Sequence, residues 1–200
     1  MTFVYVVTFF IRLLQYPVEK LMRTANMLHI FLFFIISCTK AILDIIMKRK
    51  DKSELIIAIL IPIAVGTLSA LFSGNMQIYS RINKPALSPP GILFPIVWTI
   101  LYILMGISSY IIYESDNPNK ESALRTYALQ LFFNFFWSII FFRLNLFFTS
   151  FVWLLALIFL IVKMIVQFYR IKPIAAYLQI PYLLWCIFAA YLNFMIFRIN

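Results

Sequence analysis

Charged residues are scarce in this chain: they make up 12% of its 200 residues, whereas a soluble domain has about 25%. Hydrophobic residues make up 64%, and the mean hydropathy is +0.96. The chain contains four glycines and two cysteines. Four glycines are too few for a phosphate-binding glycine-rich loop. Cys38 and Cys186 lie far apart and form no CxxC pair, so they indicate packing rather than a disulfide framework or a metal site. This composition predicts an integral membrane protein.

Acidic residues and histidine are rarer still, and they fall outside the long apolar segments. His29, the one histidine, lies near the N-terminus. Proton-coupled transporters use carboxylates or histidines within the membrane, and acid–base, metal and triad chemistry need the same groups. We therefore expect no catalytic residue and no metal site in the membrane segments. The acidic residues are Glu19, Asp44, Asp51, Glu54, Glu114, Asp116 and Glu121.

The chain divides into an N-terminal extension, residues 1–46, and a membrane domain, residues 47–200. The extension is apolar but interrupted by charges, and an extra membrane-associated helix is the alternative interpretation. Met47 starts the basic sequence MKRKDK immediately ahead of the first long apolar segment. At about 20 residues each, the apolar segments predict an all-α bundle with five transmembrane helices, at residues 55–73, 92–113, 124–142, 146–169 and 174–197, the last with a kink at Pro181.

Short links between the predicted helices require neighbouring helices to be antiparallel. The net charge of +10 is distributed between the spans, which indicates topology signals and contacts to anionic lipid rather than nucleic-acid binding. Nine basic residues on one side against four on the other place the N-terminus of the first helix in the cytoplasm. The nine are Lys48, Arg49, Lys50, Lys52, Lys120, Arg125, Lys163, Arg170 and Lys172, and the four are Arg81, Lys84, Arg143 and Arg198.

Small residues recur every fourth position along the first predicted helix. This spacing places them on one ridge, and such ridges let helices approach closely in lipid. The ridge predicts either packing within the bundle or a homodimer interface. Its members are Ala58, Pro62, Gly66, Ala70 and Gly74.

A proline-rich loop leads directly into the second predicted helix. Pro85, Pro89 and Pro90 fix φ and lack backbone donors, so we expect a stiff loop that covers a site among the helices. One turn into the helix, Trp98 is followed at i+4 by Tyr102. This spacing puts both rings on one face, and we expect them to line a cavity.

Two further faces carry amides and indoles. Gln130, Asn134 and Trp137 share one face of the third predicted helix, and Trp185, Ala189 and Asn193 share one face of the fifth. These faces predict either a ligand site or hydrogen bonds between helices. Tryptophans in membrane helices also form interfacial belts, which is our interpretation of Trp153.

Several separated motifs in this order resemble the TspO/MBR family, which comprises bacterial tryptophan-rich sensory proteins and the mitochondrial translocator protein, also called the peripheral benzodiazepine receptor. The resemblance covers about residues 55–200. The motifs are Lys84-Pro85-x-x-x-Pro89-Pro90; Phe94 with Trp98-x-x-Leu101-Tyr102-x-x-Met105-Gly106; Gln130 with Asn134-x-x-Trp137 and Phe141-Phe142; and Pro181-Tyr182-x-x-Trp185 with Ala189 and Leu192-Asn193.

The resemblance implies a five-helix bundle, commonly a homodimer, with a pocket that binds porphyrins such as protoporphyrin IX near the first loop. No cofactor is required. Two tryptophans that the family carries in this loop are replaced here by Ile78 and Leu87, which puts ligand affinity and identity in question. The predicted ligand-binding residues are Tyr79, Pro89, Pro90, Phe94, Trp98, Tyr102, Gln130, Asn134, Trp137, Trp185 and Ala189.

The leading functional hypothesis is a membrane receptor or sensor that binds a porphyrin-like tetrapyrrole, located in the bacterial cytoplasmic membrane. A second hypothesis is light- or oxygen-dependent porphyrin degradation, with Trp98 and Trp185 as electron or radical participants. A third is transport of porphyrin or lipid across the membrane, which the lack of ionisable residues in the core of the predicted bundle disfavours.

Overall fold

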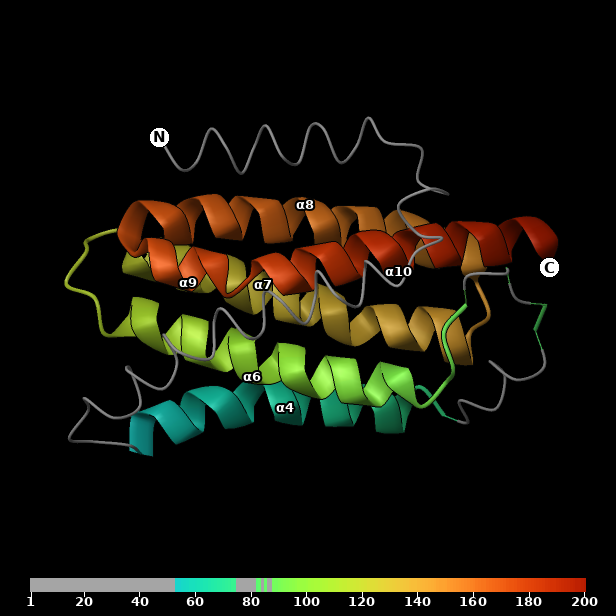
Figure 1. The fold of residues 1–200 in the computed structure, drawn as a ribbon, viewed down its shortest axis with the longest axis horizontal. Coiled ribbons are helices and arrows are strands. Elements are labelled where there is room, and N and C mark those ends of the chain that lie inside the picture. Colours follow the sequence, from blue (N-terminus) through green and yellow to red (C-terminus); the bar gives the residue numbers. More distant parts are fainter. Residues whose placement is uncertain (1–52, 75–81, 84, 86–87) are drawn as a thin grey trace. The chain divides into compact units, whose positions relative to one another are not determined.

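The structure is a computed structural model that describes residues 53–74, 82–83, 85 and 88–200. In these residues all regular secondary structure is helical (Figure 1), which confirms the predicted all-α class. The helices are α4 (Ser53–Phe72), α6 (Leu93–Tyr113), α7 (Lys120–Ser138), the π-helix η1 (Ile139–Arg143), α8 (Phe147–Ile171), α9 (Pro173–Tyr177) and α10 (Ile180–Ile199).

The third predicted helix begins earlier and ends differently than the sequence pattern indicates. α7 starts at Lys120 rather than at residue 124. Glu121 lies in its first turn, where a carboxylate is favoured by the helix dipole, and Arg125 lies 3.7 Å from it one turn later. These charged residues resemble a loop in composition although they form a helical turn. At its other end α7 passes without interruption into the π-helix η1.

The last predicted helix is divided into two. α9 ends at Tyr177, and α10 begins at Ile180 with Pro181 in its first turn. The chain therefore turns before Pro181 instead of bending there. Proline is well tolerated in a first turn because that position has no intrahelical partner for a backbone N–H.

Many of the outward-facing side chains of the described helices are large and apolar. Large aliphatic and aromatic residues remain exposed along α4 and α8, among them Leu71 at 71% and Phe159 at 69%. Within the described part of the chain, four helical segments are long and apolar enough to cross a membrane: Ser53–Phe72, Leu93–Tyr113, Phe147–Ile171 and Pro173–Ile199. The polar first turns of α7 keep it outside that group. A surface of this kind faces lipid rather than water, so the chain is an integral membrane protein.

Successive long helices run in opposite directions, and their connections gather at two ends of the bundle (Figure 1). The loop end holds the end of α4, the start of α6, the link between η1 and α8, and the C-terminus (Figure 1). The turn end holds the start of α4, the link between α6 and α7, and the junction of α8 with α9 (Figure 1). At the loop end Asn83 and Asn200 exchange two hydrogen bonds of 3.0 and 3.1 Å. These bonds attach the segment before α6 to the end of α10.

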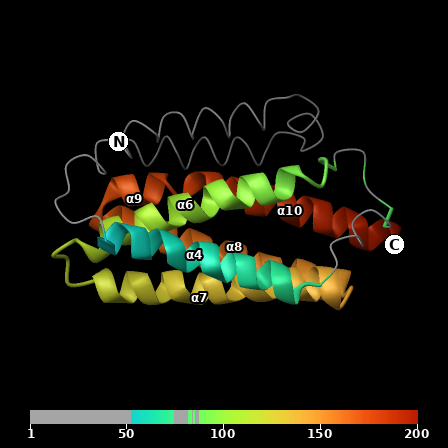
Figure 2. The same cartoon turned by 90° about the horizontal axis from the view of Figure 1, so that it is seen from below.

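α4 packs between α6 and α7 (Figure 2). α7 in turn packs on α8, and α8 packs on α9 and α10. Ser69 of α4 donates a 2.7 Å hydrogen bond to the carbonyl oxygen of Phe135 in α7. Because apolar burial adds little to helix association in lipid, such bonds and close backbone contacts fix the positions of the helices.

α4 and α6 approach each other closely at Gly106. A Cβ atom there would lie 2.7 Å from the carbonyl oxygen of Ala58 and would also overlap the backbone of Ile59. The small-residue ridge of α4 takes part in the same interface, since a Cβ on Gly66 would overlap the ring of Tyr102. Gly74 follows α4 with φ of 74°, a conformation that glycine adopts without strain.

Gly106→Ala should therefore separate α4 from α6. We expect a loss of about 1–3 kcal/mol of stability, since the added methyl meets backbone atoms that cannot rotate away. Thermal unfolding of the purified protein in one detergent would measure it. Ala64→Leu is the control, because it adds carbon atoms at an exposed position of α4, the helix that Gly106 contacts. Equal melting temperatures for both variants and the parent would contradict the close contact.

Candidate functional site

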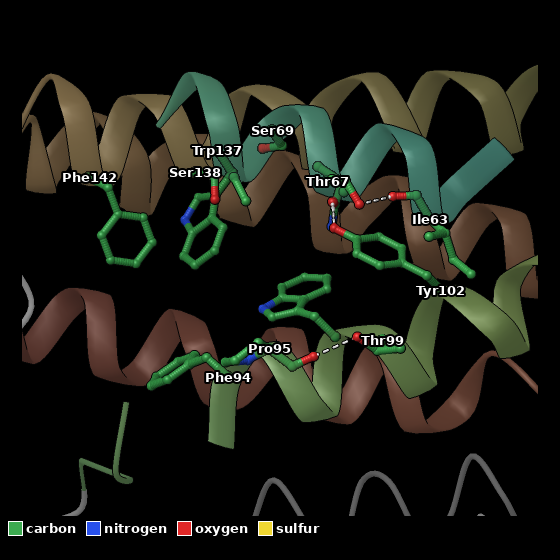
Figure 3. Close-up of a pocket in the computed structure, with 14 residues that line it drawn as sticks. Ile63, Thr67, Ser69, Phe94, Pro95, Thr99, Tyr102, Trp137, Ser138 and Phe142 are labelled. Carbon is green, nitrogen blue, oxygen red and sulfur yellow. Dashed lines mark hydrogen bonds between the residues drawn. The ribbon is translucent and has the colours of Figure 1, made fainter. Parts of the chain in front are cut away.

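A cavity of about 250 Å³ lies between α4, α6, α7 and η1 in the half of the bundle nearer the loop end. Figure 3 shows Trp137 and Phe142 on one side of this space, with Phe94 and Pro95 on the other. Its lining is mostly aromatic, small or hydroxyl-bearing, with one aliphatic and one amide side chain: Ile63, Gly66, Thr67, Ser69, Ala70, Phe94, Pro95, Trp98, Thr99, Tyr102, Asn134, Trp137, Ser138 and Phe142.

Trp98 is the centre of an aromatic cluster beside the cavity. Its ring stacks on Tyr102 with centroids 5.5 Å apart. It also meets Trp137 at 6.2 Å and the edge of Tyr182 at 6.1 Å. These separations lie in the range of favourable aromatic pairs. One indole thus contacts rings from α6, α7 and α10.

A chain of hydrogen bonds crosses the bundle next to this cluster. The Tyr102 hydroxyl donates to Oδ1 of Asn134 at 2.9 Å. Nδ2 of Asn134 donates to the Tyr182 hydroxyl at 3.1 Å, which donates to Oε1 of Gln130 at 2.9 Å. Gln130, Asn134 and Tyr182 are each at most 3% exposed. We call these four residues the tyrosine–amide chain.

Helical periodicity explains why these side chains meet. Trp98 and Tyr102 are one turn apart on α6, and Asn134 and Trp137 are one turn apart on α7, so each pair shares a face. The π-helix η1 then changes the register of α7: Phe141 is 4% exposed in the core, while the adjacent Phe142 lines the cavity. π-Helical turns of this kind occur frequently at functional sites.

Five of the residues predicted to bind ligand line this one cavity: Phe94, Trp98, Tyr102, Asn134 and Trp137. Helices α6 and α7 therefore bring together the side chains that the sequence patterns placed on two separate faces.

The remaining predicted positions lie elsewhere. Gln130 is buried behind Asn134 in the tyrosine–amide chain. Trp185 does not line the cavity, but it meets Phe94 edge-on with centroids 5.8 Å apart. Ala189 is buried in α10 and does not line it either. Asn193, on the same face, forms a side-chain hydrogen bond with Ser150 of α8.

The proline-rich loop is described only in part. Pro90 accepts a 2.9 Å hydrogen bond from the backbone N–H of Leu93, so it forms the turn that starts α6. Neither Pro89 nor Pro90 lines the cavity. Tyr79, together with Ile78 and Leu87, falls outside the described residues, and the predicted covering role of this loop stays a prediction.

Sequence reasoning missed several contributors. Tyr182 joins both the aromatic cluster and the tyrosine–amide chain, and Phe142 lines the cavity. Both occur in the motifs quoted above, but periodicity gave no reason to choose them. The small lining residues Thr67, Thr99 and Ser138 carry no distinctive sequence signal.

The cavity is suited to binding a neutral aromatic surface. None of the described residues that line it is charged, and the described part of the chain holds no cluster of potential metal ligands. The hydroxyls of Thr67 and Thr99 donate to carbonyl oxygens of their own helices, at 2.8 Å each. Recognition would depend on ring contacts and shape.

Trp153 differs from the other tryptophans. Its ring stacks on Phe133 at 4.4 Å, and its Nε1 donates a 2.8 Å hydrogen bond to the Phe133 carbonyl oxygen. It packs α8 against α7 and does not line the cavity.

Asn134→Leu should break the tyrosine–amide chain and leave the Tyr102 hydroxyl without its acceptor. We expect a loss of about 1–3 kcal/mol, the cost of an unsatisfied buried polar group. In a double-mutant cycle with Tyr102→Phe, the stability losses of the two single variants should sum to more than the loss of the double variant. The reason is that removing both partners leaves neither the hydroxyl nor the amide without a hydrogen-bond partner. Strict additivity of the melting-temperature shifts would show that the two groups do not interact.

Comparison with known proteins agrees with this geometry. A model of the TspO/MBR family matches residues 58–199. The Tryptophan-rich protein TspO of Archaeoglobus fulgidus is 36% identical over 149 residues, which are 74% of this chain and 97% of that protein. The Tryptophan-rich sensory protein of Cereibacter sphaeroides is 32% identical over 137 residues, covering 68% of this chain and 85% of that protein. The Translocator protein of Sus scrofa is 33% identical over 146 residues, covering 70% and 86%.

The family match spans most of the chain, and the relatives are matched over nearly their whole lengths. The cavity and the tyrosine–amide chain lie entirely within the matched range. The resemblance of the sequence motifs is therefore confirmed, and the chain belongs to the TspO/MBR family.

Proposed function

We propose that this protein is a membrane receptor or sensor that binds a porphyrin-like tetrapyrrole in the cavity between α4, α6 and α7. The observation that carries the proposal is the position of Trp98, whose indole lines the cavity and contacts Tyr102 and Trp137. A flat aromatic macrocycle has the surface that such a cluster recognises.

The names of the relatives support a role in recognition. One is called a sensory protein and another a translocator protein. The described cavity offers no charged side chain for acid–base work, which favours binding over conventional hydrolysis or group transfer.

The size of the cavity limits how a macrocycle would bind. Its 250 Å³ falls just below the roughly 300–1,000 Å³ of typical ligand pockets. A tetrapyrrole would therefore insert one edge beside Trp98, with the remainder projecting toward the loop end. Because Ile78 and Leu87 replace two indoles of that loop, we expect weaker binding than in relatives that keep both.

We also propose that the protein lies in the bacterial cytoplasmic membrane as a homodimer, with the turn end of the bundle in the cytoplasm. The basic residues counted along the sequence support this orientation. Lys120, Arg125 and Arg170 belong to helix ends on this side.

Protoporphyrin IX should quench the intrinsic tryptophan fluorescence of the purified protein saturably. Trp98→Phe should raise the dissociation constant roughly two- to tenfold, since an aromatic contact contributes about 0.5–1.5 kcal/mol. The control is Trp153→Phe, which removes one of the other three tryptophans. Trp153 lies away from the cavity, so this change should leave the affinity for protoporphyrin IX unchanged. Absence of saturable quenching in the folded parent protein would rule out the proposed binding.

Degradation of the bound porphyrin is a second candidate function. It is favoured by the contacts from Trp185 through Phe94 to the cavity and from Trp98 to Tyr102, because adjacent indole and phenol rings are redox-active side chains. Under illumination in air, porphyrin absorbance should then fall faster with the parent than with Trp98→Phe or Trp185→Phe, all at saturating porphyrin. Equal rates would remove both tryptophans from the mechanism and leave binding alone.

A further inference from the structure

A second cavity, of about 410 Å³, lies at the turn end of the bundle. It is bounded by α4, α6 and α7, three of the four elements that bound the first cavity. Its lining combines aliphatic residues with three tyrosines: Glu54, Ile57, Ala58, Ile61, Ser109, Tyr110, Tyr113, Leu124 and Tyr127.

The two cavities are separate. They share none of the described lining residues. Between them Gly106 of α6 lies against the backbone of Ala58 and Ile59 in α4, and Leu131 of α7 is 5% exposed. A molecule in the second cavity would therefore not contact Trp98 or the tyrosine–amide chain.

Tyr127 presents an unsatisfied donor at the second cavity. Its side chain is 7% exposed, and its hydroxyl has no hydrogen-bond partner among the described residues. Ser109 is its polar neighbour; the Ser109 oxygen could accept a bond while its hydroxyl donates to the carbonyl oxygen of Gly106 at 2.9 Å, but the geometry forms no hydrogen bond between the two side chains. A buried donor without an acceptor is unfavourable, so an acceptor oxygen on a bound molecule would be stabilised there.

The second cavity is accessible from the lipid. Ile57 and Ile61, which line it, are 57% and 50% exposed on the outer face of α4. Tyr113 and Glu54 lie at the helix ends, and the Lys120 ammonium donates a 3.1 Å bond to the Tyr113 carbonyl oxygen. Tyr127 is two turns farther along α7, about 10 Å in, near the boundary between the hydrocarbon core and the interfacial layer.

We propose that the second cavity binds a glycerolipid of the surrounding bilayer. An ester carbonyl oxygen of the lipid accepts a hydrogen bond from Tyr127, and the attached acyl chain packs against Ile57, Ala58 and Ile61. The ester oxygens of bilayer lipids lie at this boundary, and they are acceptors without a donor of their own. This assignment is independent of the ligand proposed for the first cavity.

Photocrosslinking tests the site directly. The probe is phosphatidylcholine with a diazirine in one acyl chain, added at limiting concentration to the full-length protein in detergent, with adducts located by mass spectrometry. We expect adducts to concentrate in residues 54–61 and 109–127. Unlabelled phosphatidylcholine and dioleoylglycerol should both compete, because they share the acyl ester; competition by phosphatidylcholine alone would assign recognition to the headgroup and overturn the proposed contact.

Two variants separate lipid binding from folding. Tyr127→Phe should lower the adduct yield in these segments roughly two- to tenfold, the effect of one lost hydrogen bond. Ala58→Leu, which fills the cavity, should lower it further. Tyr191→Phe removes a tyrosine hydroxyl from α10, outside the described lining of the cavity, and should change nothing.

The melting temperature in lipid-free detergent provides the second measurement. Tyr127→Phe should keep or raise it, because the variant loses only an unpaired hydroxyl. A marked fall would show that the hydroxyl has a structural partner and would overturn the proposal. A second result would also overturn the proposal: adducts that form equally on the lipid-facing residues Phe159 and Val162 of α8 and whose yield does not change in Tyr127→Phe.

Discussion

The tyrosine–amide chain is the interaction on which the rest of the structure depends. In lipid, apolar surface gives little preference for one helix arrangement over another, and interhelical hydrogen bonds contribute only about 0.6 kcal/mol each on average. These bonds are directional, and they therefore select one arrangement of the helices. Asn134 can form hydrogen bonds with both Tyr102 and Tyr182 only when α6, α7 and α10 adopt one relative placement. The close contact at Gly106 then sets α4 against α6. Together these contacts leave a cavity beside Trp98 instead of filling it.

The chemistry of that cavity follows from what surrounds it. The polar groups near it are mostly engaged with one another: Asn134 binds two tyrosines, and the threonine hydroxyls bind backbone carbonyls. The surfaces left for a ligand are ring faces and small side chains. These surfaces match the shape and aromatic character of the ligand that we propose.

The sequence allowed the fold class and much of the cavity to be predicted, because both follow from short-range periodicity. Apolar length located the helices, and i, i+3 and i, i+4 spacing placed Trp98 with Tyr102 and Asn134 with Trp137. Contacts that depend on how the helices are placed in space could not be predicted from the sequence. Trp185, Ala189 and Asn193 share a face, yet Asn193 binds Ser150 of α8 and Ala189 does not line the cavity. The charged start of α7, the π-helix η1 and the division before Pro181 each depend on local backbone geometry that composition does not encode.

The most direct test of the account is to locate a bound porphyrin relative to the tryptophans. Paramagnetic manganese protoporphyrin broadens nearby nuclei, and the chain has four indole N–H groups, which 15N labelling resolves by NMR. A porphyrin bound beside Trp98 should broaden the Trp98 and Trp137 signals first, in proportion to site occupancy, while the Trp153 signal stays sharp. Diamagnetic zinc protoporphyrin is the control for shifts that do not arise from proximity. Broadening of Trp153 ahead of Trp98, or uniform broadening of all four signals, would contradict a porphyrin site between α4, α6 and α7.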